Sequence, residues 1–257
     1  MMKLSISTGT ILKLGEHVIG CGDATDSTFV TRVIGKAKVR QILTDPPYGI
    51  DYVASKEDFS GHKGRHVPIV NDHLQTDEEY RLFTKKWLEA VKPHLAGKNT
   101  IYCFNCDRMI FALREGMQDA GFKLSQLLVW VKTQPIAGRL DHHPQHELIA
   151  YGWHGTHERI RCSDRTVLVH PKPHKSDLHP TCKPVALLRR LVLNGTRTGD
   201  IVYDSFLGSG STLLACQETS RRCIGVEVSP EYCRVVCERL EKATGIAAKV
   251  ISSPSRS

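Results

Sequence analysis

Four consecutive residues, Asp45-Pro46-Pro47-Tyr48, follow a short apolar run that ends at Thr44 and form the strongest local signal for chemistry in the chain. The two prolines fix φ and have no N–H, so backbone carbonyl oxygens face whatever lies in front of the strand without a competing donor. Together with the Asp45 carboxylate and the Tyr48 ring, they suit a planar group that bears an amine. The structural alternative is a Pro-Pro turn that the aspartate caps.

A glycine-rich segment at residues 202–212 predicts a strand that ends at Asp204, a tight turn and a helix that begins shortly afterwards. Gly208 and Gly210 would let a ligand approach the backbone closely at the helix N-terminus. No Gly-Lys-Ser/Thr follows, which argues against a phosphate loop. The next predicted strand ends in Glu227, where a carboxylate can hold both hydroxyls of a ribose. This spacing favours a βαβ unit that binds an adenosine-containing ligand; the alternative is an ordinary βαβ unit whose glutamate lies on the surface.

The overall composition excludes several classes of protein. In 257 residues, 40% are hydrophobic and 24% charged, which is ordinary for a globular chain and not for a disordered one. No window approaches the ~20 apolar residues of a membrane span, and we expect no signal peptide. Nine scattered cysteines predict a reduced, intracellular protein. The formal charge is +8, and residues 123–190 hold eleven Lys/Arg against five Asp/Glu, which suggests nucleic acid or a solvated basic surface.

These chemical groups must be positioned by regular elements. Short apolar runs alternate with segments of helical period, which predicts a mostly parallel sheet covered by helices. Helices are expected after the Thr76/Glu79 capping box, after Pro184 and after Ser229-Pro230. Residues 251–257 are expected to be a frayed tail. The expected strands are residues 17–20, 39–44, 100–104, 127–131, 148–151, 201–203 and 223–226.

Taken in order, four motifs of this chain closely resemble the β (permuted) group of amino-methylating DNA methyltransferases, the DNA methylase N-4/N-6 family. The resemblance extends from about Gly22 to Leu240, and in this group the catalytic half precedes the cofactor half. It implies an α/β fold with a single doubly wound, mostly parallel seven-stranded sheet of the Rossmann-like, class I S-adenosylmethionine-dependent type. One domain would span residues 1–257. The matching segments are residues 45–48, 179–184, 204–212 and 225–227, with 129–132 and 146–151 between them.

The resemblance also implies a cofactor, S-adenosyl-L-methionine, and the residues that hold it. Glu227 would take the ribose hydroxyls, Asp23 would lie near the adenine amine, and Thr181 with Lys183 would close the methionine end. Cys182 stands where the family usually has Gln, and Ser211 where it often has Thr, which affects only the closure of the cofactor site. The main cradle would consist of Asp204, Phe206, Gly208, Gly210 and Thr212.

The implied catalytic residues are Asp45, Pro46, Pro47 and Tyr48. An exocyclic amine on a base is a poor nucleophile, because its lone pair is delocalised into the ring. If Asp45 and the Pro46 carbonyl accept both hydrogens, the lone pair is freed for in-line attack on a sulfonium methyl group. The base must leave the duplex, at a cost of a few kcal/mol that stacking on Tyr48 partly offsets. Within the family, the Asp-led tetrapeptide favours adenine N6.

Several alternatives remain open at this point. They are methylation of cytosine N4, methylation of adenine in RNA, and a catalytically silent DNA-binding protein with this fold. The intact Asp45, Glu227 and glycine turn argue against the last of these. A zinc site could begin at Cys103 and Cys106. Because Cys103 falls within an apolar strand, packing is the favoured interpretation, and we expect no metal.

Double-stranded DNA is the expected partner, with no membrane, and the protein is expected to act as a monomer or homodimer. Small DNA-facing insertions around residues 54–70 and 132–178 would share recognition, since the chain has no room for a large separate domain. A cytoplasmic location in a prokaryote, or a phage origin, fits this interpretation. The expected phosphate contacts are Lys63, Arg65, Arg139, Arg159, Arg161, Arg165, Lys172 and Lys175.

Overall fold

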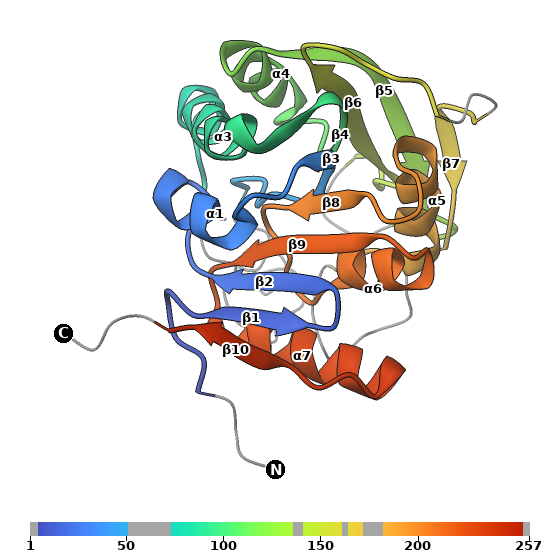
Figure 1. The fold of residues 1–257 in the computed structure, drawn as a ribbon. Helices are drawn as coiled ribbons and strands as arrows, with labels where there is room; N and C mark the ends of the chain where they lie inside the picture. The colour runs from blue at the N-terminus through green and yellow to red at the C-terminus, as the bar shows by residue number, and fades with distance from the viewer. Residues whose placement is uncertain (1–4, 51–72, 136–140, 161–163, 172–181, 254–257) are drawn as a thin grey trace.

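The structure, a computed structural model, describes residues 5–50, 73–135, 141–160, 164–171 and 182–253. Ten strands form one sheet in this part of the chain (Figure 1). They are β1 (Ile11–Leu14), β2 (His17–Cys21), β3 (Val39–Thr44), β4 (Leu95–Asn105), β5 (Phe122–Val131), β6 (His146–His154), β7 (Val167–Val169), β8 (Ile201–Asp204), β9 (Arg222–Glu227) and β10 (Lys249–Ser252). Their order across the sheet is β10-β1-β2-β9-β8-β3-β4-β6-β5-β7.

The centre of the sheet is parallel. Strands β2, β9, β8, β3 and β4 all run in one direction. β6 is antiparallel to both of its neighbours, β4 and β5, so β5 again points the same way as β4. This arrangement confirms the predicted mostly parallel, doubly wound α/β fold.

All seven expected strands form, but the count of seven was too low. β1, β7 and β10 extend the sheet at its two edges. They are four, three and four residues long, too short to produce a clear alternating pattern in the sequence. β10 includes Ile251, which was expected in a frayed tail, because its backbone pairs with β1.

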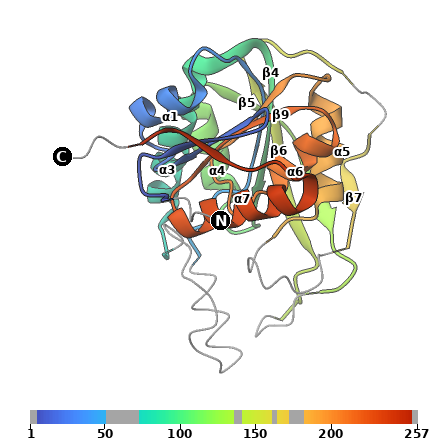
Figure 2. The ribbon, with the colours of Figure 1, turned by 60° about the horizontal axis from the view of Figure 1, so that its bottom comes forward.

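Helices cover both faces of the sheet (Figures 1 and 2). α1 (Ser27–Ile34), α3 (Asp77–Val91) and α4 (Ile110–Asp119) pack on one face, with a short 3₁₀ turn, η1 (Lys92–His94), after α3. α5 (Val185–Gly195), α6 (Ser211–Glu218) and α7 (Pro230–Thr244) pack on the other. Trp87 in the first core and Trp130 in the second are almost completely buried. Among the described residues, no helix is long and apolar enough to cross a membrane.

The expected helix starts are confirmed. The Thr76 hydroxyl accepts the Glu79 N–H (3.2 Å), and the Glu79 carboxylate accepts the Thr76 N–H (2.8 Å), so the capping box begins α3. The Ser229 hydroxyl accepts the Tyr232 N–H (3.3 Å), ahead of α7. α5 begins directly after Pro184. These caps fix where each helix leaves the carboxyl edge of the sheet.

The winding of the chain reverses between β3 and β8. β3 leads through α3 to β4 on one side, and β8 leads through α6 to β9 on the other. In doubly wound sheets the crevice at such a reversal, beyond the carboxyl ends of the strands, is the usual ligand site. Here the Thr44 hydroxyl at the end of β3 donates to the Asp204 carboxylate at the end of β8 (2.8 Å), which joins the two halves at that point.

Candidate active site

Acidic residues stand at the carboxyl ends of four neighbouring parallel strands. Asp204 and Glu227 are the last residues of β8 and β9, Asp45 directly follows β3, and Asp23 lies two residues beyond β2. Because these strands are adjacent in the sheet, the four carboxylates line one edge of it. The sequence-predicted acidic residues of both halves are therefore brought together.

Asp45 is held by two donors. The Tyr48 hydroxyl donates to its Oδ1 (2.8 Å), and the Lys183 ammonium donates to its Oδ2 (2.5 Å). Lys183 lies just before α5 and is only 8% exposed, although it is 138 residues away in the chain. Pro46 is buried and Pro47 half-buried. The expected catalytic tetrapeptide thus forms a fixed turn at the winding reversal.

Glu147 and Lys132 complete this arrangement, and the sequence had assigned neither a role. Glu147 Oε2 accepts from Lys183 Nζ (3.1 Å) and from the Tyr48 hydroxyl (3.1 Å), while Oε1 accepts from Lys132 Nζ (2.7 Å). Lys132 directly follows β5 and Glu147 is the second residue of β6, so antiparallel pairing brings them together. We call Asp45, Tyr48, Lys132, Glu147 and Lys183 the Asp45 cluster.

The charges of the Asp45 cluster set its protonation states. Burial raises the pKa of Asp45; the nearby Lys183 lowers it and Glu147 raises it further. Burial disfavours the ionised form of Glu147 too, but Lys183 and Lys132 lower its pKa to about 2. Burial opposes the charge on Lys183, yet the two carboxylates raise its pKa. At neutral pH, Glu147 is therefore ionised and Lys183 protonated, while Asp45 is the cluster's carboxyl that protonates more readily.

On the other side of the winding reversal, Asp204 supports the segment 205–210 between β8 and α6, which we call the glycine turn. Its carboxylate accepts the Phe206 N–H (3.1 Å) as well as the Thr44 hydroxyl. Burial raises the pKa of Asp204 to about 6, while hydrogen bonds from Thr212 and Thr44 lower it. Thr212 lies in the first turn of α6, as expected. Asp204 therefore fixes the start of the turn by a hydrogen bond to its backbone.

Glu227 faces the same glycine turn. Its Oε2 accepts the Gly208 N–H (2.7 Å), and its Oε1 accepts the Ser229 N–H (2.9 Å). The residue is only 8% exposed, and burial raises its pKa to about 7. A carboxylate has about four lone-pair sites, so beside the backbone N–H groups that it accepts, Glu227 keeps acceptor capacity for a ligand.

The backbone conformation of this turn requires glycine at two positions. Gly208 and Gly210 have φ of +52° and +83°, a region that side chains other than glycine rarely adopt. A Cβ at Gly210 would lie 3.0 Å from Val236 of α7. Glycine is therefore required at both positions by the backbone conformation, and at Gly210 also by the contact with α7, immediately before the N-terminus of α6.

Two further residues expected to bind the cofactor are Phe206, within this turn, and Asp23, just beyond β2. The half-buried Phe206 ring packs against Phe83 and Trp87 of α3, at centroid distances of 5.6 and 5.7 Å. Asp23 is exposed and accepts the Thr25 N–H (2.8 Å). It follows the strand that pairs with β9, next to Glu227. Both positions are compatible with the ends of an elongated ligand along this edge.

The neighbouring residues Cys182 and Lys183 contact different parts of the site. Cys182 Sγ lies 3.1 Å from Ser211 Oγ at the start of α6, on the glycine-turn side. The closure of the cofactor's methionine end by Thr181 and Lys183 stays a prediction; in this structure Lys183 extends to Asp45 and Glu147. The reason is electrostatic, because the buried ammonium lies between two carboxylates. Thr181 lies outside the described residues.

The expected DNA contacts are only partly visible. Arg165 is exposed beside Asp164, which pairs with Arg190 of α5. Arg159 is also exposed, but the preceding Glu158 pairs with Arg40 near the start of β3, at the opposite end of that strand from Asp45. Arg159 therefore follows a residue held at the end of β3 that is remote from the Asp45 cluster. The other expected contacts lie outside the described residues: Lys63, Arg65, Arg139, Arg161, Lys172 and Lys175.

Cys103 and an apolar pocket take no part in the Asp45 cluster. Cys103 is fully buried in β4, and burial raises the pKa of its thiol.

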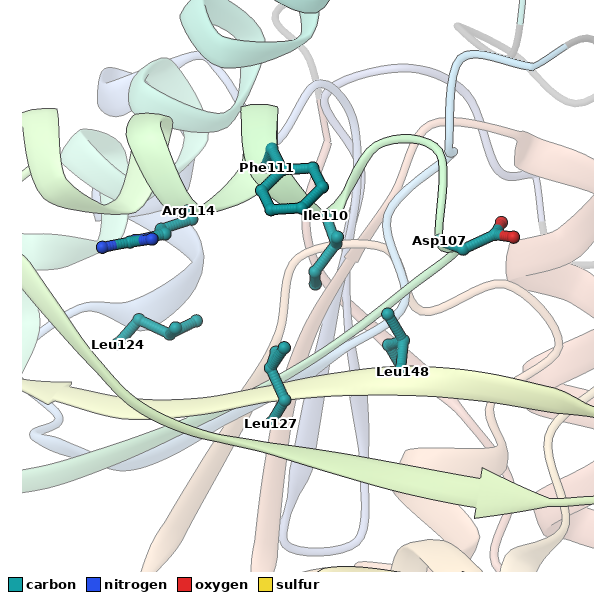
Figure 3. A pocket seen from close by; sticks show the side chains of 7 residues that line it. All are labelled: Asp107, Ile110, Phe111, Arg114, Leu124, Leu127 and Leu148. Carbon is teal, nitrogen blue, oxygen red and sulfur yellow. The ribbon is translucent and has the colours of Figure 1, made fainter.

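A pocket of about 350 Å³ lies between α4, β5 and β6 (Figure 3). Its lining includes Phe111, which is 70% exposed, together with Leu127 and Leu148. Its described lining contains none of the residues predicted for catalysis or cofactor binding.

Known proteins share both this sequence pattern and this fold. Type II methyltransferase M2.DpnII of Streptococcus pneumoniae is 26% identical over 225 residues, covering 78% of this chain and 81% of the relative. A crystal structure of an M1.HpyAVI–SAM complex superposes with a TM-score of 0.65 at 23% identity, covering 86% and 98% of the two chains. The PvuII DNA methyltransferase, described as cytosine-N4-specific, gives 0.69 at 14% identity, covering 95% and 89%.

A family model described as DNA methylase, for enzymes of the N6/N4 type, matches residues 39–238. The match runs from the first residue of β3 to within two residues of Leu240 in α7. It therefore includes the Asp45 cluster, the glycine turn and Glu227. By this match over most of its length, and in agreement with the resemblance carried by its motifs, the chain belongs to the N6/N4 family of DNA methylases.

Proposed function

We propose that this DNA methylase transfers a methyl group from S-adenosyl-L-methionine to the exocyclic N6 of adenine in double-stranded DNA. One observation carries the proposal: the Asp45 carboxylate and the buried Pro46 stand next to the glycine turn, joined through Thr44 and Asp204. The Asp-led tetrapeptide supports adenine over cytosine, by resemblance within the family.

The residues around the glycine turn fit S-adenosylmethionine. Glu227 keeps acceptor capacity beside the Gly208 and Ser229 N–H groups, which suits ribose hydroxyls. Gly208 and Gly210 allow a ligand to approach the backbone before α6. Asp23, beyond the neighbouring strand, suits an adenine amine. The M1.HpyAVI complex contains this cofactor and has a similar fold, which supports the same choice here.

When bound, S-adenosylmethionine supplies a methyl group on a positively charged sulfur. Asp45 and the Pro46 carbonyl then accept the hydrogens of the target amine and orient its lone pair. Tyr48 stacks on the base, which must have left the duplex. The amine loses one proton for each methyl group gained. Asp45 Oδ suits this proton, since burial raises the pKa of Asp45 and the Lys183 ammonium remains protonated.

The remaining parts of the proposal concern DNA and assembly. A single catalytic domain over residues 1–257 would bind DNA through basic insertions around 54–70 and 132–178, as a monomer or a homodimer. Phosphate contacts by such segments would make binding depend steeply on salt. Arg165 is the described arginine best suited to such a contact, because it is exposed and lies close to β7 at the edge of the sheet.

The deciding experiment transfers a labelled methyl group to unmethylated DNA, followed by analysis of the nucleosides and sequencing of modified sites. N6-methyladenine supports the proposal; N4-methylcytosine, or transfer only to RNA, contradicts the choice of substrate. Asp45→Ala should abolish transfer while S-adenosylmethionine still binds in calorimetry. The matched control is Asp119→Ala, the same change at an exposed aspartate that pairs with Arg81. Absence of cofactor binding by the wild type would favour a silent DNA-binding protein.

A further inference from the structure

Two donors in the Asp45 cluster are shared between two carboxylates. Lys183 Nζ lies 2.5 Å from Asp45 Oδ2 and 3.1 Å from Glu147 Oε2. The Tyr48 hydroxyl lies 2.8 Å from Asp45 Oδ1 and 3.1 Å from the same Glu147 oxygen. Each donor can therefore move its hydrogen bond from Asp45 to Glu147 with almost no displacement.

This sharing matters because both oxygens of Asp45 are engaged. An arriving amine must find an acceptor that already binds a hydroxyl and an ammonium. Lys183 also neutralises Asp45, although positive charge develops on the amine nitrogen as it gains the methyl group. A carboxylate stabilises that charge only when its own charge is not already compensated.

We propose that Glu147 is a positioning residue that takes Lys183 and Tyr48 from Asp45 when the target amine binds, so that Asp45 becomes free to accept the amine. This role rests on the proposed methyl transfer. Glu147 itself does not touch the base; it acts through the two donors that it receives.

Lys132 keeps Glu147 in position for the exchange. It is 2% exposed and binds Glu147 Oε1 (2.7 Å), so Oε2 is the oxygen that faces Lys183 and Tyr48. The Lys132 ammonium also lies 5.3 Å from the centre of the Trp130 ring, which helps to fix it. With two lysines and two carboxylates, the cluster has no net formal charge, and the exchange moves hydrogen bonds without moving charge out of it.

The exchange prepares a balanced transfer. The bond between the amine nitrogen and the methyl carbon forms while the bond between that carbon and sulfur breaks, and its electron pair stays on sulfur. The nitrogen then releases one proton, which Asp45 accepts. With Lys183 turned to Glu147, the carboxylate of Asp45 is a stronger acceptor for that proton.

The test is Glu147→Gln, which keeps the shape of the side chain and removes its charge. We expect kcat to fall about tenfold or more, with KM for DNA and for S-adenosylmethionine within about twofold. The acid limb of the pH–rate profile should move to lower pH. The titratable groups that interact with Asp45 are Lys183, Tyr48 and Glu147, together with Asp204 across the winding reversal, Cys103 of β4 and Tyr80 of α3. Removing the like charge of Glu147 leaves Lys183 as the dominant neighbour.

Two further variants separate positioning from simple structural support. Glu147→Asp restores the charge and should recover part of kcat. Lys132→Met combined with Glu147→Gln restores the charge balance but leaves only a neutral amide oxygen to compete with Asp45 for Lys183, so kcat should stay low. The matched control is Glu158→Gln, since Glu158 is also paired with basic residues but lies at the far end of β3.

Three results would overturn the inference: wild-type kcat in Glu147→Gln, no recovery in Glu147→Asp, or recovery in the double variant. If Glu147→Gln does not fold, Glu147→Asp is compared with the wild type alone. Because its shorter side chain reaches Lys183 and Tyr48 less well, a reduced kcat at unchanged KM supports the role, and a kcat and acid limb identical to wild type contradict it. The wild type is measured first in the same assay. No methyl transfer by the wild type contradicts the proposed function, whereas transfer with an indifferent Glu147 contradicts only this inference.

Discussion

Cofactor binding should release a proton from Glu227. Burial raises the pKa of Glu227 to about 7, even though the backbone N–H groups of Ser229, Gly208 and Val228 favour its ionised form. Two ribose hydroxyls would add donors to this carboxylate and stabilise its charge, so its pKa must fall in the complex. Affinity for S-adenosylmethionine therefore rises with pH until about 7 and is constant above it.

The size of the effect follows from that pKa. At pH 6 only about a tenth of Glu227 is ionised, and at pH 8 nearly all of it. If the ionised form is the one that binds, affinity at pH 6 is about tenfold weaker than at pH 8, equivalent to ~1.4 kcal/mol. Nearly one proton per cofactor should leave Glu227 at pH 6. Asp204, with a pKa raised by burial to about 6, adds a smaller release.

Titration calorimetry at pH 6, 7 and 8, in buffers with different ionisation enthalpies, measures both the affinity and the protons released. Glu227→Gln should bind more weakly at pH 8 and lose most of the proton release. Glu158→Gln is the control, because hydrogen bonds from Arg197 and Arg40 lower the pKa of Glu158 to about 2, so this residue stays ionised throughout the range. A constant wild-type affinity between pH 6 and 8, or unchanged proton release in Glu227→Gln, would refute the reasoning.

Three further substitutions test other parts of the structure. Gly210→Ala should destabilise the protein by about 1 kcal/mol or more and weaken cofactor binding, because φ is +83° and the new Cβ meets Val236; thermal unfolding and calorimetry measure both. Trp87→Ala should cost about 3–5 kcal/mol in urea unfolding, since this side chain of α3 is fully buried in the core. Arg159→Glu should leave DNA affinity within about twofold in a salt titration, whereas Arg165→Glu should lower it and reduce the salt slope.

Much of the fold could be predicted because its signals are local. Each parallel strand is an apolar run, and the capping residues Thr76 and Ser229 stand directly before their helices. The short edge strands could not be predicted in the same way. β7 has three residues, of which Val167 and Val169 are exposed, so only its pairing with β5 makes it a strand.

The predicted acidic residues of the site were recognisable because each follows its own strand. Glu147 and Lys132 are different, since their importance comes from contact with each other and with Lys183, 36 residues or more away in the chain. One available signal was a lysine directly after one apolar run and a glutamate at the start of the next. Only the antiparallel pairing of β5 and β6 turns those two positions into a buried ion pair.

The link between Thr44 and Asp204 explains why the order of motifs in this chain does not disturb the site. The two residues are 160 positions apart, but they end adjacent parallel strands and share a 2.8 Å hydrogen bond. A site at a winding reversal needs only that each carboxylate follow its strand and that the strands be neighbours. Which strand comes first in the chain is irrelevant to that requirement. The half that holds Asp45 can therefore precede the half that holds Glu227, with Asp45 and the glycine turn still at the carboxyl ends of adjacent strands.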